Sequence, residues 1–291
     1  MFNKVLEITL PIFFIVLVGF FYSRHTKPNL ASSNKLILDL ALPALIFTSL
    51  SSKNFDIEAS GYFLLVATLI IFLSGLVVFP ISRFSGINWR GLLPCVMFGN
   101  VGPIGIPLAL LAYGQNGLPP AVILFVLSNV LHFTVGAWLM SGRWDAKTIY
   151  ASPLVWSTLL GILFSKLHWH IPKSLDISVS MISQILVPMM LISLGARLGQ
   201  SQFQHIQLGS FGSMIAIAIR LPLALLFIQF VPLSELQRGI LILFSALPPA
   251  VFNFMLADRF NQESTKVAAI VFTGHIASLA FLPLAIWLVF S

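Results

Sequence analysis

The sequence has very few charged side chains. Asp, Glu, Lys and Arg make up 9% of its 291 residues, whereas soluble domains carry about 25%. A soluble fold of this length could not hide the 58% of residues that are hydrophobic, and no polar block is long enough for a separate soluble domain. The composition therefore excludes an ordinary soluble protein and predicts an all-α integral membrane protein with a single membrane domain.

Cysteine and the common catalytic motifs are also scarce or missing. Cys95 is the only cysteine, which excludes a disulfide within the chain and any site built from several cysteines. The phosphate-binding pattern G-x-x-x-x-G-K-[ST] does not occur, so ATP is not the direct energy source. The nucleophile pattern G-x-S-x-G is missing as well. We expect no enzyme activity, no bound metal and no cofactor.

Hydrophobic runs dominate what is present. A bilayer core about 30 Å thick needs a helix of about 20 apolar residues. Ten runs approach or exceed this length, at 5–22, 33–51, 60–81, 91–113, 119–140, 150–168, 176–198, 206–231, 237–257 and 265–290. The connections are short and contain no linker or low-complexity tract. The sequence thus predicts ten transmembrane helices.

The basic residues indicate an orientation in the membrane. The net charge is +7, but the cations stand singly in short loops and form no patch for nucleic acid. Loops after the odd-numbered runs hold ten Lys and Arg residues, those on the other side hold five, and Arg220 lies inside the eighth run. The positive-inside rule places the richer side in the cytoplasm. We expect a multi-pass protein of the plasma membrane with both termini outside.

The fourth run contains an unusual cluster of helix-breaking residues. Residues 98–107 include three glycines, two prolines and Asn100. Backbone groups freed in hydrocarbon are costly, so interrupted helices face other helices or a wet cavity. In secondary transporters such interruptions build the substrate site. The alternative is a simple kink, because membrane helices are rich in Gly and Pro.

Two pairs of prolines suggest an internal repeat. A shift of 145 residues places Pro43 on Pro188 and Pro103 on Pro248. The same shift places Asn100 on Ser245. We infer two five-helix repeats, residues 1–145 and 146–291. Because five is odd, the two repeats must insert with opposite orientation, as in many transporters.

Several segments resemble the auxin efflux carrier family, including its bacterial branch of malate and malonate permeases. The similarity covers nearly the whole chain, and its most distinctive segments are 42–47, 100–114, 220–222 and 247–257. The resemblance implies ten helices in two inverted repeats, with helices 4 and 9 broken and crossing at mid-membrane. It also implies a mobile core domain that rocks against a scaffold.

The chain departs from the plant members of that family in two places. Only residues 141–149 join the fifth and sixth runs, where long plant members carry a large cytoplasmic loop. Asn253 stands where plant members tend to have the crossing proline. The resemblance therefore favours a bacterial-type carrier over an auxin carrier.

Candidate substrate-binding residues follow from the two predicted breaks. Half-helix N-termini offer partial positive charge and free N–H groups to a carboxylate. The resemblance makes Asn100 a carboxylate-binding residue, although an amide of this kind can also join two helices. The other candidates are Gly102, Gly105, Pro107, Ser245, Pro248 and Asn253. The glycines and prolines among them serve the architecture of the site.

Ionisable residues inside the runs are candidates for charge coupling, since they are costly there. Arg220 could neutralise a substrate carboxylate or bind the carbonyls of a broken helix. Asp39 could bind a coupling ion or lie at a helix end. His132 and His275 could carry a proton or serve only as hydrogen-bonded packing residues.

These features predict a secondary active transporter or uniporter for a small organic anion, such as a mono- or dicarboxylate, working by alternating access. Its partners would be the substrate and the lipid bilayer, with H⁺ or Na⁺ as the coupling ion if there is one. A channel or receptor is the main alternative, and an intramembrane enzyme a weaker one. A homodimer is among the options for its oligomeric state.

Overall fold

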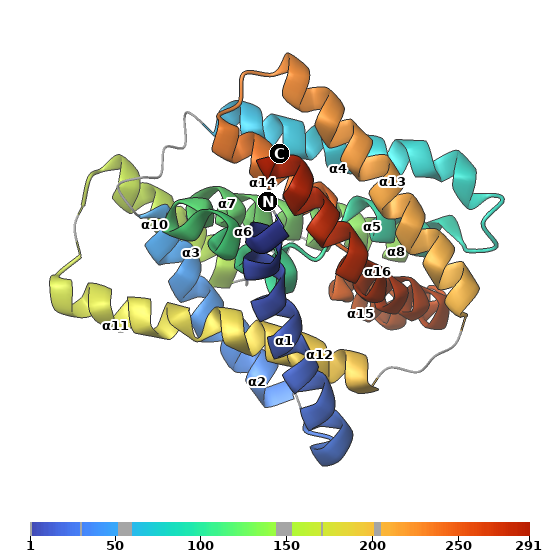
Figure 1. The fold of residues 1–291 in the computed structure, drawn as a ribbon, viewed down its shortest axis with the longest axis horizontal. Helices are drawn as coiled ribbons and strands as arrows, with labels where there is room; N and C mark the ends of the chain where they lie inside the picture. The colour runs from blue at the N-terminus through green and yellow to red at the C-terminus, as the bar shows by residue number, and fades with distance from the viewer. Residues whose placement is uncertain (1, 30, 52–59, 144–152, 170, 201–204) are drawn as a thin grey trace.

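The described part of the chain is almost entirely helical (Figure 1). The computed structural model describes residues 2–29, 31–51, 60–143, 153–169, 171–200 and 205–291. Within these ranges there is no strand, and the one extended pairing is an isolated bridge between Gly99 and Pro249. The predicted all-helical class is confirmed.

The helices of the N-terminal part are α1 (Phe2–Thr26), α2 (Ala31–Leu36), η1 (Ile37–Ala41), α3 (Leu42–Leu50), α4 (Gly61–Ser82), α5 (Trp89–Met97), η2 (Val101–Gly105), α6 (Ile106–Tyr113), η3 (Gly114–Gly117), α7 (Leu118–Leu131), η4 (His132–Gly136) and α8 (Ala137–Ser141). Those of the C-terminal part are α10 (Pro153–Lys166), α11 (Lys173–Gln184), α12 (Leu186–Gln200), α13 (Ile206–Phe230), α14 (Glu235–Ser245), α15 (Val251–Arg259) and α16 (Ser264–Phe290).

Six helical stretches in the described residues are long and apolar enough to cross a membrane: Phe2–Thr26, Gly61–Ser82, Val101–Ser141, Lys173–Gln200, Ile206–Phe230 and Ser264–Phe290. Ile37–Leu50 and Pro153–Lys166 are shorter apolar helices. These eight stretches overlap nine of the ten predicted runs, because Val101–Ser141 covers parts of both the fourth and the fifth. The fourth run is divided between α5 and η2–α6. The number of ten spans stays a prediction, as does the division into two repeats. Most of the predicted connection at 141–149 lies outside the described residues.

Small residues allow α1 and α12 to pack closely. A Cβ atom at Gly195 would overlap the carbonyl oxygen of Val16, and one at Gly19 would overlap that of Ile192. Without a side chain at these positions the two backbones come into direct contact. In lipid there is no hydrophobic driving force for helix association, because the lipid tails are themselves apolar. Membrane helices therefore often associate through close van der Waals packing at glycines.

Polar contacts join the first residues of α5 to those of α16. Lys266 Nζ lies 2.6 Å from Glu263 Oε1, and the N–H of Asn88 donates to Glu263 Oε2 over 2.7 Å. Partial burial raises the pKa of Glu263, but the bonds from Lys266 and Asn88 outweigh it and leave the pKa below its usual value. The carboxylate therefore stays ionised and holds the two helix starts together.

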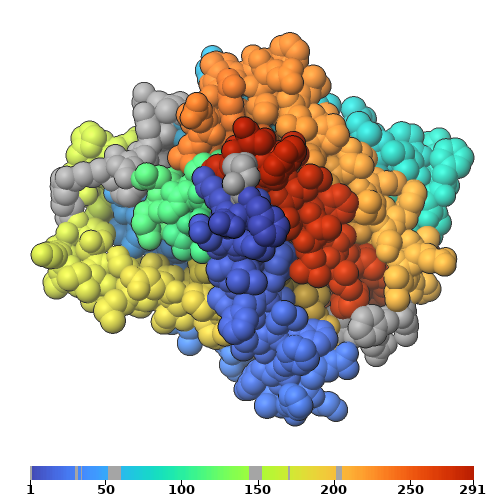
Figure 2. Space-filling model, viewed as in Figure 1, coloured from blue at the N-terminus to red at the C-terminus, as the bar shows by residue number. Residues whose placement is uncertain are grey.

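The two ends of the chain lie side by side. Figure 1 draws the N-terminus of α1 next to the C-terminus of α16, and Lys4 Nζ is 3.5 Å from the centroid of the Phe290 ring. On the surface, α1 (dark blue) lies against α16 (red) (Figure 2). The two termini thus lie close together, and the side of the membrane they face stays a prediction.

Candidate functional site

Two short extended segments meet in the interior of the molecule. The first, residues 98–100, follows α5, and the second, residues 247–250, precedes α15. The N–H of Asn100 donates to the carbonyl of Pro248 over 2.7 Å, and the N–H of Ala250 donates to that of Phe98 over 3.0 Å. Buried backbone groups need partners, and here the two segments satisfy each other.

Arg220 and Asn253 complete the hydrogen bonding of this crossing. Arg220 extends from α13 and donates through Nη2 to the carbonyl of Leu247 and through Nε to that of Ala216. Asn253 Nδ2 donates to the carbonyl of Phe98 over 3.3 Å. Both side chains are buried. Two roles were predicted for Arg220, and the contact observed here is the one with a backbone carbonyl. The carbonyl of Leu247 lies just beyond the end of α14, where the helix dipole favours a cation.

Gly99 is required at this crossing for steric reasons. A Cβ atom there would overlap Arg220 Nη1 and lie 3.4 Å from Leu247 Cβ. The guanidinium therefore rests directly on the bridged backbone, and any side chain at this position would push it away.

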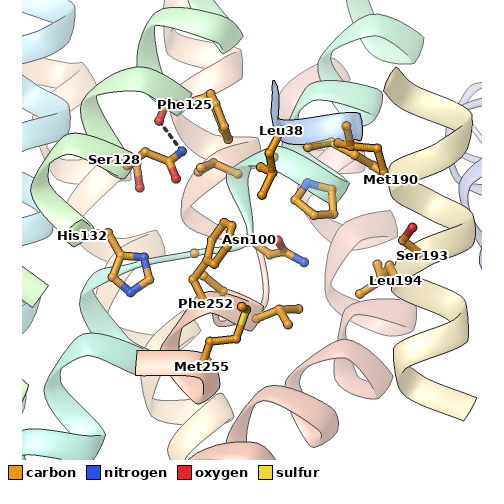
Figure 3. A pocket seen from close by; sticks show the side chains of 18 of the residues that line it. Leu38, Asn100, Phe125, Ser128, His132, Met190, Ser193, Leu194, Phe252 and Met255 are labelled. Atoms are coloured by element: carbon orange, nitrogen blue, oxygen red, sulfur yellow. Dashed lines mark hydrogen bonds between the residues drawn. The ribbon is translucent and has the colours of Figure 1, made fainter. Parts of the chain in front are cut away.

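A cavity of about 100 Å³ lies beside the crossing (Figure 3). The figure shows Asn100 near its centre, His132 on one side, and Ser193 and Leu194 of α12 on the other. The walls are mostly apolar and include Leu38, Phe125, Met190, Phe252 and Met255. A mostly apolar cavity with a few placed polar groups is typical of small-molecule sites.

Asn100 is held by a histidine that is distant in sequence. Its Nδ2 lies 2.8 Å from Nε2 of His275 on α16, and Nδ1 of His275 lies 2.6 Å from the carbonyl oxygen of Val271. A carbonyl can only accept, so Nδ1 carries the hydrogen. In the neutral ring Nε2 then accepts from Asn100. The structure thus brings together two of the residues singled out from the sequence.

His132 and Asn253 form a second group near the crossing. The His132 ring stacks on Phe98, with the centroids 4.3 Å apart. Nε2 of His132 and Oδ1 of Asn253 are buried without a hydrogen-bond partner among the described residues. Because unsatisfied buried polar atoms are rare, this pair indicates a place for a proton, a water molecule or a substrate atom. His132 also lines the cavity.

The remaining predicted residues divide between the cavity, its supports and the surface. Gly102 lines the cavity and packs against Phe125. Gly105 and Pro107 are buried in the helical segment behind it. Pro248 lies in the extended segment, while Ser245 ends α14 and lines a smaller cavity together with Arg220. Asp39 is exposed and does not line the cavity.

Four polar residues of the cavity wall were not selected from the sequence. Ser128, Asn129, Ser193 and Arg197 all line the cavity. Asn129 Nδ2 donates to the carbonyl of Phe125, and Arg197 Nη1 lies 3.7 Å from Met255 Sδ. The sequence did contain a signal for Ser193, because the 145-residue shift pairs this residue with Thr48. Arg197 was counted only as a loop cation.

Comparisons of the sequence with known proteins show its family. The model of the membrane transport protein family matches residues 4–151 and 143–288. A protein of Rhizobium meliloti described as a putative malonate transporter is 22% identical, over 95% of this chain and 93% of its own. The uncharacterized transporter YfdV of Escherichia coli is 24% identical, over 92% and 93%.

A plant protein is similar over the same extent. Auxin efflux carrier component 8 of Arabidopsis thaliana is 22% identical, over 94% of each chain. Since the family model spans nearly all of the sequence, the chain belongs to the membrane transport protein family, the family of the auxin efflux carriers.

Proposed function

We propose that this protein is a secondary active transporter or uniporter that moves a small organic anion, a mono- or dicarboxylate, by alternating access. The observation that carries the proposal is the cavity in which the Asn100 amide, the start of α15 and Arg197 converge. The first N–H groups of a helix have no partner within it and attract anions. Arg197 of α12 adds a positive charge to the cavity wall. The description of one relative as a putative malonate transporter supports a carboxylate substrate.

The proposed mechanism uses ten helices in two inverted repeats, residues 1–145 and 146–291. In it the extended segments at 98–100 and 247–250 lie at mid-membrane, as the crossing of helices 4 and 9. Two separate clusters of buried apolar residues support relative movement. Leu194 of α12 belongs to the first cluster and Leu256 of α15 to the second, and both helices line the cavity. A shift between the two clusters would open and close the cavity.

The proposal includes an orientation. Arg197 lies at the cation-rich end of its predicted span, so the cavity faces the cytoplasm when both termini are outside. The described conformation then corresponds to an inward-facing or closed state. A channel would need a continuous wet path, and no specific feature of the cavity favours one.

The test is transport by purified protein in liposomes. We expect saturable counterflow of malonate, or of another acid from a panel of mono- and dicarboxylates chosen by thermal shift. Asn100→Ala and Asn253→Ala should each abolish transport, because they remove amide groups at the cavity and the crossing. Asn3→Ala is the matched control, since Asn3 is exposed on α1 and should leave transport unchanged. Wild-type rates in both variants would remove the site assignment, and a non-saturating conductance would indicate a channel.

A further inference from the structure

The hydrogen bond between Asn100 and His275 links the polarity of the cavity to a proton. We propose that His275 is the proton-binding site of this carrier. Its protonation turns the Asn100 amide around, so that the cavity offers N–H donors to a carboxylate only when the proton is bound. The inference rests on the proposed function and specifies H⁺ as the coupling ion.

The described geometry is that of the neutral ring. Nδ1–H donates to the carbonyl of Val271, and Nε2 accepts from Asn100 Nδ2. With its nitrogen held by His275, the amide turns its other atom, the oxygen Oδ1, away from the ring. Asn100 lines the cavity, so in this state it presents an acceptor there. A carboxylate oxygen is also an acceptor and is disfavoured next to it.

A proton from water on Nε2 reverses this arrangement. The imidazolium is a donor at both nitrogens, and an amide nitrogen cannot accept. The amide must then rotate by half a turn about its terminal torsion, so that Oδ1 accepts from Nε2–H. Its NH₂ group takes the place of the oxygen and can donate to a carboxylate. No covalent bond other than the new N–H is made, and every hydrogen bond of the pair is preserved.

The negative charge that balances such a proton has to come from a bound anion and not from a side chain of the protein. The titratable residues on helices packed against α16 are Lys4, Glu7, Tyr22, Arg24 and His25 on α1, Arg90 and Cys95 on α5, Arg220 on α13, Glu235 and Arg238 on α14, and Asp258 and Arg259 on α15, with Lys266 on α16 itself. Except for Arg220, which lies near the middle of α13, all lie within two turns of a helix end.

None of these groups is hydrogen-bonded to the imidazole of His275, whose partners in the described structure are Asn100 and Val271. A buried charge without a partner is costly, so an anionic substrate in the cavity stabilises the protonated state. By linkage, the proton must raise the affinity for the anion by the same factor. This cooperative binding of H⁺ and carboxylate is what a symporter requires.

The experiment measures proton uptake and the pH profile with malonate as the probe. We expect the wild type to take up about one proton per malonate bound at pH 7.5 in a weakly buffered solution. Initial uptake should fall about tenfold for each pH unit on the alkaline side of its profile, as a single essential proton requires. His275→Gln keeps an amide in hydrogen-bonding reach of Asn100 but cannot titrate. It should flatten the profile and lose the malonate-linked proton uptake. His168→Gln, an exposed histidine, is the control and should behave as wild type.

The following results would overturn the inference. If the wild type transports malonate with no linked proton uptake, or only with a Na⁺ gradient, His275 is not the coupling site; this measurement needs no variant to fold. The same holds if His275→Gln retains the wild-type pH profile, or if only His132→Gln flattens it. If the wild type moves no carboxylate of the panel at all, the proposed function itself fails, and the inference with it.

Discussion

At the scale of single residues, the crossing depends on polar side chains that serve the backbone. Arg220 is buried, and it donates hydrogen bonds to main-chain oxygens on α13 and just after α14. Asn253 likewise donates to the carbonyl of Phe98. An extended segment inside a membrane protein has no water to satisfy it, so these side chains are needed for stability before any role in transport.

Replacing Arg220 should therefore destabilise the protein. In Arg220→Leu the carbonyl of Leu247 loses its donor, and an unsatisfied buried acceptor costs roughly 1–3 kcal/mol. Unfolding in detergent by SDS titration measures the change. Arg143→Leu is the control, because Arg143 is exposed beyond α8 and should leave the midpoint unchanged. Equal midpoints for both variants would mean that the guanidinium does not hold the crossing together.

Predictions for single residues were limited because the sequence does not say which face of each helix points toward the cavity. Asn100 and the importance of the 98–107 segment could be predicted, because an amide among glycines and prolines is locally distinctive. The pairing of Asn100 with His275 could not, since it depends on how α16 packs across the crossing. Asp39 was selected as one turn from Pro43, but η1 is a π-helical turn, where spacing by 3.6 residues no longer predicts the face.

At the scale of elements, the class of structure was predictable and the exact helix ends were not. The long apolar runs predicted the bounds of α1, α4, α13 and α16 to within a few residues. The cluster of breakers in the fourth run extends to Pro107, yet the chain is non-helical only from Phe98 to Asn100 and helical again from Val101. The reason is that proline is compatible with the first turn of a helix, where its missing N–H is not needed. Pro107 occupies such a position in α6.

The packing of α1 on α12 gives a second testable consequence. In Gly195→Ala the new methyl group would overlap the carbonyl oxygen of Val16, so the helices must separate. Overpacking of this kind costs about 1–3 kcal/mol, and the SDS midpoint should fall accordingly. Gly61→Ala is matched to it, because a Cβ atom at Gly61 meets nothing within 4 Å. Should Gly195→Ala be as stable as Gly61→Ala, the close contact between the two helices would not exist in the protein.

At the scale of the whole molecule, the cavity lies where several distant parts of the chain meet. Its walls come from η1, η2, α7, η4, α12, α15 and the two extended segments, so no single motif contains the site. The 145-residue offset pairs Pro103, which lines the cavity, with Pro248 of the second extended segment. It could not place Arg197 in the wall, because that depends on how the end of α12 leans toward Met255 of α15.

Substrate protection of an engineered cysteine tests most directly whether an organic anion binds in this cavity. Met255 is 44% exposed and lines the cavity, so Met255→Cys in a Cys95→Ala background gives one reactive thiol there. We expect malonate at ten times its Kd to slow maleimide labelling about tenfold, since binding removes the free form by mass action. A thiol at the exposed Ser178 of α11 should be unaffected. Equal labelling of Met255→Cys with and without saturating carboxylate would contradict the account.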